Sequence, residues 1–202
     1  MQSAAAALGS VLEFAAEVEE TVSRVDRALP PLRRLLAAVG MPFKLVGGLA
    51  VVHHGYVRTT RDLDLLLEPA ANQLLSDALL AEHGFERLSP RKLRHRGSGV
   101  DVDLLLAGEP MPRWGAPRYP SPADLPGSRR DPDFVALPGL VELKLHAARH
   151  QDLADVVALL KKVDDFEYLQ LEAGLPAGLR IRLGELRRDA LEELGWERES
   201  RS

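Results

Sequence analysis

Two short segments that alternate aspartate with aliphatic residues constrain the fold of this chain more than any other feature. They are Asp62-Leu63-Asp64-Leu65-Leu66-Leu67 and Val100-Asp101-Val102-Asp103-Leu104-Leu105-Leu106. A period of two is typical of a β-strand, so the aspartates of each segment are expected to share one face. Carboxylates inside otherwise apolar strands normally need partners. If the two strands pair, three or four carboxylates converge, and such a cluster is unfavourable unless cations are present.

A glycine pair lies shortly before the first acidic segment. The apolar run 43–46 is followed by Gly47-Gly48 and then by a helical pattern over 49–54. A strand, a glycine turn and a helix N-terminus present backbone N–H groups to anions. The segment lacks the Gly-Lys-Ser/Thr ending of a P-loop and the third glycine of a dinucleotide fingerprint. Glycine turn and acid pair together favour transfer of a phosphate-bearing group with Mg²⁺ or Mn²⁺.

These residues resemble the minimal nucleotidyltransferases of the DNA polymerase β superfamily, and in particular its AbiEii/MenT-type, toxin-like members. The family pattern is an apolar strand, a glycine pair, a short helix, an Arg-x-Thr-x-Asp-x-Asp run and a third aspartate in a later strand. In this chain the pattern falls on Gly47, Gly48, Arg58, Thr60, Asp62, Asp64 and Asp103. Asp101 is the alternative to Asp103 as third acid. Segments 140–145 and 152–156 extend the resemblance, which covers about residues 43–162.

The resemblance implies an α/β (or α+β) fold with a small mixed sheet. It implies that the catalytic residues are Asp62, Asp64, Asp103 and Lys144. It also implies that the nucleotide is bound by Gly47, Gly48, Arg58 and Thr60. The three aspartates would hold Mg²⁺ or Mn²⁺. The expected reaction moves NMP from an NTP to a hydroxyl of tRNA or of a protein, as in the toxin of a toxin–antitoxin pair with an antitoxin partner. Two alternatives stay open: a non-catalytic nucleotide-binding or antitoxin-like module, and an enzyme that modifies a small-molecule (antibiotic) hydroxyl.

Some polar side chains near these motifs allow two interpretations, and others have one expected role. The helical neighbours of Lys144 are apolar, so its ammonium is expected on a buried face, where it either reaches out to solvent or meets an acid or phosphate. Arg58 either clamps phosphate or pairs with a carboxylate. Thr60 is expected to satisfy backbone groups. The basic run 91–96 is expected to be a solvated face, with an RNA backbone as the alternative. Asp152 is expected to cap a helix, and Asp155 is expected in a structural ion pair.

The histidines give no metal signal. His53 and His54 end the first helix after the glycines and are interpreted as packing residues. His146 and His150 are four residues apart, but the Glu that would complete a zinc motif is missing, so this spacing is attributed to chance.

Hydrophobic periodicity and turn residues predict the order of elements. Helices are expected over 4–27, 32–39, 49–54, 70–83, 139–149, 152–162, 164–172 and 179–195, and strands over 43–46, 62–67, 85–88, 92–96 and 100–106. Pro30-Pro31 is expected to separate the first two helices, and Gly84 to end the helix 70–83. Segment 108–138 carries eight of the fourteen prolines and is expected to be a surface loop, with a lid or acceptor-binding loop as the alternative. Domain organisation follows: N-terminal helices 1–40, a core 41–138 and a helical part 139–202, packed as one compact unit.

Composition excludes some classes of protein. Zero cysteines exclude disulfides and thiol chemistry, which suits a cytoplasmic protein. A net charge of −4 argues against broad, nonspecific nucleic-acid binding. The longest apolar stretches fall far short of the ~20 residues that a membrane helix needs, and the start of the chain lacks the basic residues of a signal peptide.

Overall fold

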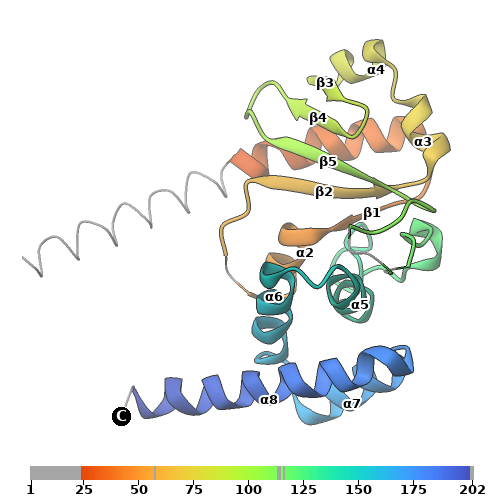
Figure 1. Cartoon of the computed structure of the whole chain (residues 1–202). Coiled ribbons are helices and arrows are strands. Elements are labelled where there is room, and N and C mark those ends of the chain that lie inside the picture. The colour runs from red at the N-terminus through yellow and green to blue at the C-terminus, as the bar shows by residue number, and fades with distance from the viewer. Residues whose placement is uncertain (1–23, 57, 113–114, 116, 201–202) are drawn as a thin grey trace, which may run out of the picture.

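A five-stranded mixed sheet forms the centre of the molecule (Figure 1). The structure is a computed structural model of the 202-residue chain, and it describes residues 24–56, 58–112, 115 and 117–200. The strands are β1 (Phe43–Val46), β2 (Asp62–Leu67), β3 (Phe85–Ser89), β4 (Lys92–His95) and β5 (Asp101–Leu106), in the order β1-β2-β5-β4-β3. Strands β2 and β5 run parallel and the other pairs antiparallel. With its flanking helices, this sheet confirms the expected α/β fold class.

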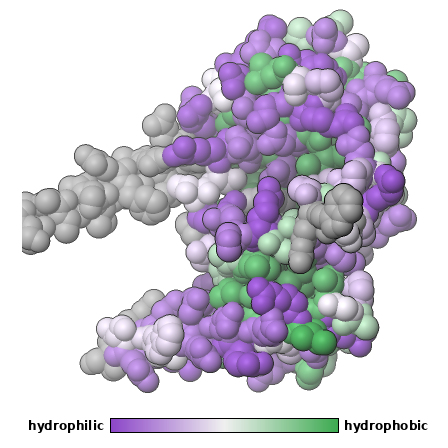
Figure 2. All heavy atoms as spheres, in the orientation of Figure 1, coloured by the Kyte–Doolittle hydropathy of each residue, from purple (hydrophilic) through white to green (hydrophobic). Residues whose placement is uncertain are grey.

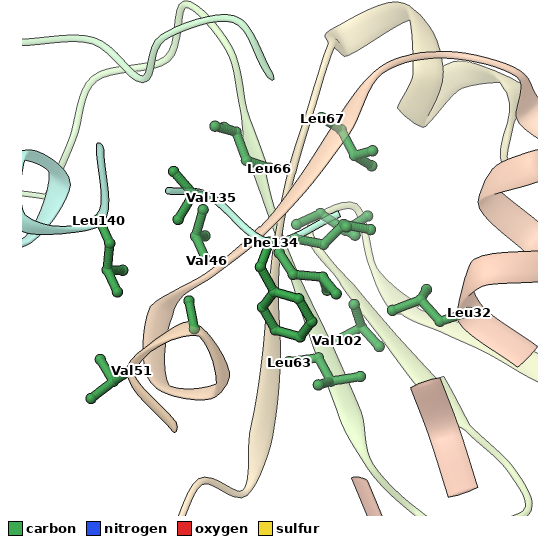
Figure 3. Close-up of a cluster of buried hydrophobic side chains, with 14 of the residues drawn as sticks. Leu32, Val46, Val51, Leu63, Leu66, Leu67, Val102, Phe134, Val135 and Leu140 are labelled. Atoms are coloured by element: carbon green, nitrogen blue, oxygen red, sulfur yellow. The ribbon is translucent and has the colours of Figure 1, made fainter. Parts of the chain in front are cut away.

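One face of the sheet is apolar because β2 and β5 alternate as their sequences predict. Leu63, Leu65 and Val102 are fully buried, and they lie on the face that packs against the helix over residues 24–39. Figure 3 shows Leu32 of that helix on the same side of the sheet as Leu63 and Val102. The aspartates of β2 and β5 therefore emerge on the opposite face.

The predicted break at Pro30-Pro31 is wrong. The helix runs without interruption from residue 24, where the described part begins, to residue 39. Two prolines cost backbone hydrogen bonds, but Leu32, Leu35 and Leu36 are completely or almost completely buried. Burial of such side chains contributes about 1.5–3 kcal/mol each, enough to offset that cost. Most of the expected helix 4–27 lies outside the described residues.

The prediction of one helix over 70–83 is also wrong in one respect, because the structure has two short helices there. They are α3 (Pro69–Leu74) and α4 (Asp77–Glu82). Ser76 interrupts them because its side chain accepts a hydrogen bond from the backbone N–H of Leu79 and so starts a new helix. Gly84, with φ of 80°, then leads into a hairpin of β3 and β4, the strands expected over 85–88 and 92–96.

Five helices lie on the other side of the sheet or beyond it (Figure 1). Helix α2 (Gly47–His53) follows β1 directly, and α5 (Leu137–Ala147) packs against it. Then come α6 (His150–Leu160), α7 (Asp165–Gly174) and α8 (Ala177–Glu199). The predicted helices after residue 139 are all present, with ends that differ by a few residues.

The proline-rich segment is irregular, as predicted, apart from one turn of 3-10 helix, η1 (Pro122–Asp124). It nevertheless returns to the sheet. Leu45 donates its backbone N–H to Asp133 O at 2.8 Å and accepts from Val135 N at 3.1 Å, forming a parallel bridge beside β1. Phe134 and Val135 are buried there. The segment therefore covers the edge of β1, which would otherwise expose unpaired backbone groups.

Within the described ranges, no helix combines the length and the apolar character needed to cross a membrane.

Figure 2 shows hydrophilic residues over most of the upper half of the face in view and hydrophobic residues toward the lower half, above α8.

Candidate active site

All eight residues that the sequence singled out lie around one open pocket of about 670 Å³. The pocket lies where the β1–α2 turn, β2, β5 and the α5–α6 corner meet. Its lining includes the predicted site residues Gly47, Gly48, Arg58, Thr60, Asp62, Asp64, Asp103 and Lys144. Asp152, Asp155, Arg149, Tyr119 and Glu109 contribute as well, and sequence reasoning assigned none of these five to a site.

The three aspartates come together because of strand register. Asp64 of β2 pairs with Asp103 of β5 in the parallel ladder, and Asp62 pairs with Asp101. Residues in register on neighbouring strands point to the same face, so all four carboxylates share the face opposite the 24–39 helix. The sequence predicted this convergence on the condition that the two strands pair, and the ladder meets that condition.

The two glycines, which the sequence placed in a turn before a helix over 49–54, are the first residues of α2 and lie against Asp64. Gly48 directs its backbone N–H toward Asp64 Oδ2 at 3.4 Å. Gly47 has a φ of 61°, a conformation that glycine adopts without strain. A Cβ atom on Gly48 would lie 2.4 Å from Arg58 Nη2 and 2.6 Å from Thr60 Oγ1. The turn therefore leaves room for Arg58 and Thr60 only because position 48 has no side chain.

Burial and mutual repulsion disfavour the charged forms of two of these acids. Burial raises the pKa of Asp64, and the nearby Asp103 raises it further, against the opposing effect of the Gly48 N–H group. The pKa of Asp62 is raised for the same two reasons, burial first and Asp103 second. A cation bound between these carboxylates would relieve both effects.

The donor chemistry fits Mg²⁺ or Mn²⁺, which prefer carboxylate oxygens completed by water and phosphate. The carboxylates are nevertheless divided among protein partners: Asp64 faces the glycine turn, and Asp103 pairs with Lys92 at 3.1 Å. Correspondingly, the part of the chain that the structure describes contains no group of three or more acidic or histidine side chains already arranged around one ion position. A cation that binds Asp103 together with Asp62 and Asp64 would therefore compete with Lys92 for the Asp103 carboxylate.

Asp101, the alternative third acid, has different surroundings. Arg94 donates to both of its oxygens, at 2.7 and 3.2 Å. These bonds lower the pKa of Asp101 below its usual value. Asp103 lines the pocket and Asp101 does not, which favours Asp103.

A buried network of charges forms the opposite wall. Lys144 is 5% exposed and donates to Asp155 at 2.7 Å and to Asp152 at 3.2 Å. Arg58 pairs with Asp155 at 3.1 Å, and Arg149 with Asp152 at 2.7 Å. Lys144 therefore meets acids and does not reach out to solvent. Asp155 takes the structural ion pairs expected of it.

The corner between α5 and α6 creates this network. Ala148 adopts a left-handed conformation (φ 46°, ψ 30°) at the end of α5, and α6 begins two residues later. Asp152 caps α6 as expected, although from the third helical position, where it accepts from the Arg149 backbone N–H at 3.2 Å. Burial would raise the pKa of Asp152, but the bonds from Arg149 and the charge of Lys144 outweigh burial and lower it. Only the spacing Lys144, Asp152, Asp155 hinted at this arrangement in the sequence.

Arg58 has unused binding capacity. Its Nε is buried and has no hydrogen-bond partner within the described ranges. Since a buried donor without a partner is costly, a movement of the side chain that brings this atom to an acceptor oxygen of a ligand would be favourable. Thr60 has the expected backbone role and donates to Asp62 O at 3.2 Å.

His53, His54 and the basic run 91–96 form their contacts with other groups of the protein. His53 stacks on Phe134 and contacts Ser128 at 2.8 Å, and His54 Nε2 lies 2.9 Å from Val135 O. Both have the packing role predicted for them. The basic run meets acids: its pairs are Arg91–Glu109, Lys92–Asp103, Arg94–Asp101 and Arg96–Glu86.

Comparison with known proteins adds no assignment, since no protein-family model and no curated protein matches the chain.

Proposed function

We propose that the chain is a metal-dependent nucleotidyltransferase. One observation carries the proposal: the glycine turn and the carboxylates of Asp62, Asp64 and Asp103 line the same pocket, with Arg58 beside them. A glycine turn at a helix start suits phosphate, and a carboxylate cluster suits a divalent cation. A nucleoside triphosphate with its cation satisfies both.

The side chains then have distinct roles. Asp62, Asp64 and Asp103 would hold Mg²⁺ or Mn²⁺, which neutralises phosphate charge and favours ionisation of a nearby hydroxyl. The Gly47-Gly48 turn and the unpartnered Nε of Arg58 would bind phosphate oxygens. Lys144 would act by holding Asp152 and Asp155, and through them Arg149 and Arg58, in place.

In the transfer step the acceptor oxygen forms a bond to the α-phosphorus of the NTP. The bond from that phosphorus to the bridging oxygen breaks, and pyrophosphate leaves with its electron pair. The hydroxyl proton passes to the carboxylate of Asp103, which acts as general base. The protein contributes mainly by positioning and by charge stabilisation, as is usual for phosphoryl transfer.

The acceptor is the open part of the proposal. The basic run 91–96 was the feature that favoured RNA, and four of its side chains are paired with carboxylates. This observation supports a second candidate, transfer to the hydroxyl of a small molecule, beside transfer to tRNA or a protein. A toxin role with an antitoxin partner remains a prediction from the resemblance alone.

The test incubates purified protein with each α-labelled NTP, Mg²⁺ and either total tRNA, cell lysate or a panel of aminoglycosides. Asp62→Ala/Asp64→Ala protein is the control. Label on tRNA, on a protein or on a small molecule with the wild type alone supports nucleotidyl transfer and identifies the acceptor class.

Two results would distinguish the remaining alternatives. Mg²⁺-dependent nucleotide binding without transfer to any acceptor would contradict the enzyme and favour a binding module. Growth arrest on expression of the wild type, but not of Asp64→Asn, would support the toxin role.

A further inference from the structure

Lys92 occupies an unusual position relative to the acidic face. It lies on β4 directly across from Asp103 in the ladder, and its Nζ is 3.1 Å from Asp103 Oδ1. The same Nζ is 3.7 Å from Asp101 Oδ2. A single ammonium therefore lies between two carboxylates of β5, of which Asp103 lines the pocket and Asp101 does not.

The surroundings allow the ammonium to move between these two acids. The side chains of Lys92 and Asp103 are 36% and 34% exposed, so water and ions reach the pair. Exposed pairs of this kind are held by only about 0–1 kcal/mol. Asp101, in contrast, has a second cation in Arg94. Lys92 can approach Asp101 when it leaves Asp103, whereas Asp103 would need a new cation.

We infer that Lys92 is an internal counter-ion that neutralises Asp103, next to Asp62 and Asp64, until a divalent cation displaces it. The inference rests on the proposed function, because it assumes that these carboxylates bind Mg²⁺ or Mn²⁺. Lys92 is a positioning residue in this scheme, since it acts through Asp103. It limits cation affinity in the free protein and protects the fold from repulsion among the acids when no cation is bound.

This role has a direct consequence for cation binding. Displacing Lys92 costs the free energy of its pair with Asp103, and that cost is subtracted from the affinity of the site. Lys92→Met removes the competitor while keeping the length of the stem. We expect it to bind Mn²⁺ about three- to fivefold more tightly, the factor that corresponds to an exposed ion pair.

The experiment is a titration of Mn²⁺ into nucleotide-free protein, followed by electron paramagnetic resonance of the unbound ion. Lys92→Arg is the conservative variant and should bind Mn²⁺ like the wild type, because it restores a cation beside Asp103. Arg96→Met is the matched control, since it removes one positive charge from the same hairpin at a residue paired with Glu86. It should change the affinity much less than Lys92→Met does.

Thermal denaturation gives a second readout. Without Mn²⁺, Lys92→Met should melt below the wild type, and saturating Mn²⁺ should raise its melting temperature by more than it raises that of the wild type. If Lys92→Met does not fold, NMR of the wild type replaces it: Mg²⁺ should shift the Lys92 side-chain resonance, assigned with Lys92→Arg.

The outcomes separate this inference from the proposed function. Equal Mn²⁺ affinity of the wild type and Lys92→Met, or weaker binding by Lys92→Met, overturns the counter-ion role but leaves the metal site standing. An unshifted Lys92 resonance while Mg²⁺ binds does the same. Absence of binding in the wild type and in all three variants, also with an NTP present, would overturn the metal-dependent function and the inference with it.

Discussion

Gly47 and the carboxylate of Asp64 lie so close together that no side chain fits between them. A Cβ atom on Gly47 would lie 1.7 Å from Asp64 Oδ2, well inside van der Waals contact. Asp64 belongs to β2, and Gly47 is the first residue of α2, which directly follows the neighbouring strand β1. The phosphate-binding element and the metal-binding element proposed above are therefore in contact, and a change in one must move the other.

Gly47→Ala is expected to destabilise the protein by more than the about 1–2 kcal/mol of a left-handed alanine, because it must also displace Asp64. Gly40→Ala is the matched control, since Gly40 has a φ of 69° and a methyl group added there would meet nothing within 4 Å. Urea denaturation measures both. Equal losses of stability in the two variants would contradict the close approach.

Asp64→Asn is expected to abolish activity and to stabilise the metal-free fold. Loss of a residue that bonds to a metal ligand lowers metal affinity or activity about 10- to 100-fold. Asp64 is a direct ligand in the proposed site, so its loss should lower activity by more. The stabilisation follows from the raised pKa of Asp64. The folded chain holds this proton more tightly than the unfolded chain, so wild-type stability falls as pH rises from about 3.8 through the folded-state pKa.

Asp64→Asn has no carboxyl group to titrate at this position, so its stability should not fall over this pH range. Its melting temperature should exceed that of the wild type at pH 7 and equal it below pH 3.8. Asp189→Asn, at an exposed position of α8, controls for loss of one charge. A variant less stable than the wild type at pH 7 would show that Asp64 is stabilised, not strained, by its surroundings.

Lys144→Met is expected to lower the free energy of unfolding by roughly 3–5 kcal/mol, because it leaves Asp152 and Asp155 buried beside each other with less positive charge. Lys144→Met/Asp155→Asn should recover part of that loss. Lys162→Met, at an exposed position, should change stability little. Denaturant titrations of the three variants measure these differences. Full stability with lost activity in Lys144→Met would instead indicate direct contact with substrate.

Arg58→Lys is expected to weaken nucleotide binding about 10- to 100-fold. This factor corresponds to the free energy that a hydrogen bond to a charged group usually contributes. Lysine can keep the ion pair with Asp155 but cannot replace Nε, the donor that has no partner in the described protein. Fluorescent nucleotide titrations with Mg²⁺ measure the change, and Arg182→Lys on α8 serves as control. Unaltered affinity would exclude Arg58 from the nucleotide site.

Sequence patterns predicted the parts of the site that depend on local structure. The alternation of Asp62 to Leu67 and of Asp101 to Leu106 indicates both strands and their faces, because side chains alternate in any extended chain. The burial of Lys144 follows from its apolar helical neighbours for the same kind of reason.

Features that depend on tertiary contacts were not predicted from the sequence. The helix continues through Pro30-Pro31 because the residues after the prolines are buried against the sheet. Arg149 joins the pocket because of the corner at Ala148, which no turn-forming residue marks. The pairing of Lys92 with Asp103 depends on the register of β4 against β5, and strand register is a property of the assembled sheet.

The bridge between Leu45 and Phe134 has a consequence for synthesis on the ribosome. The acidic strands and the glycine turn belong to the first 106 residues, but the cover for the edge of β1 and the α5–α6 corner come later, and the pocket lining extends to Asp155. Domains fold as units while they are made. A nascent or truncated chain that stops before Asp155 therefore carries every carboxylate of the acidic face without a complete pocket, and this order of assembly delays any activity until most of the chain has emerged.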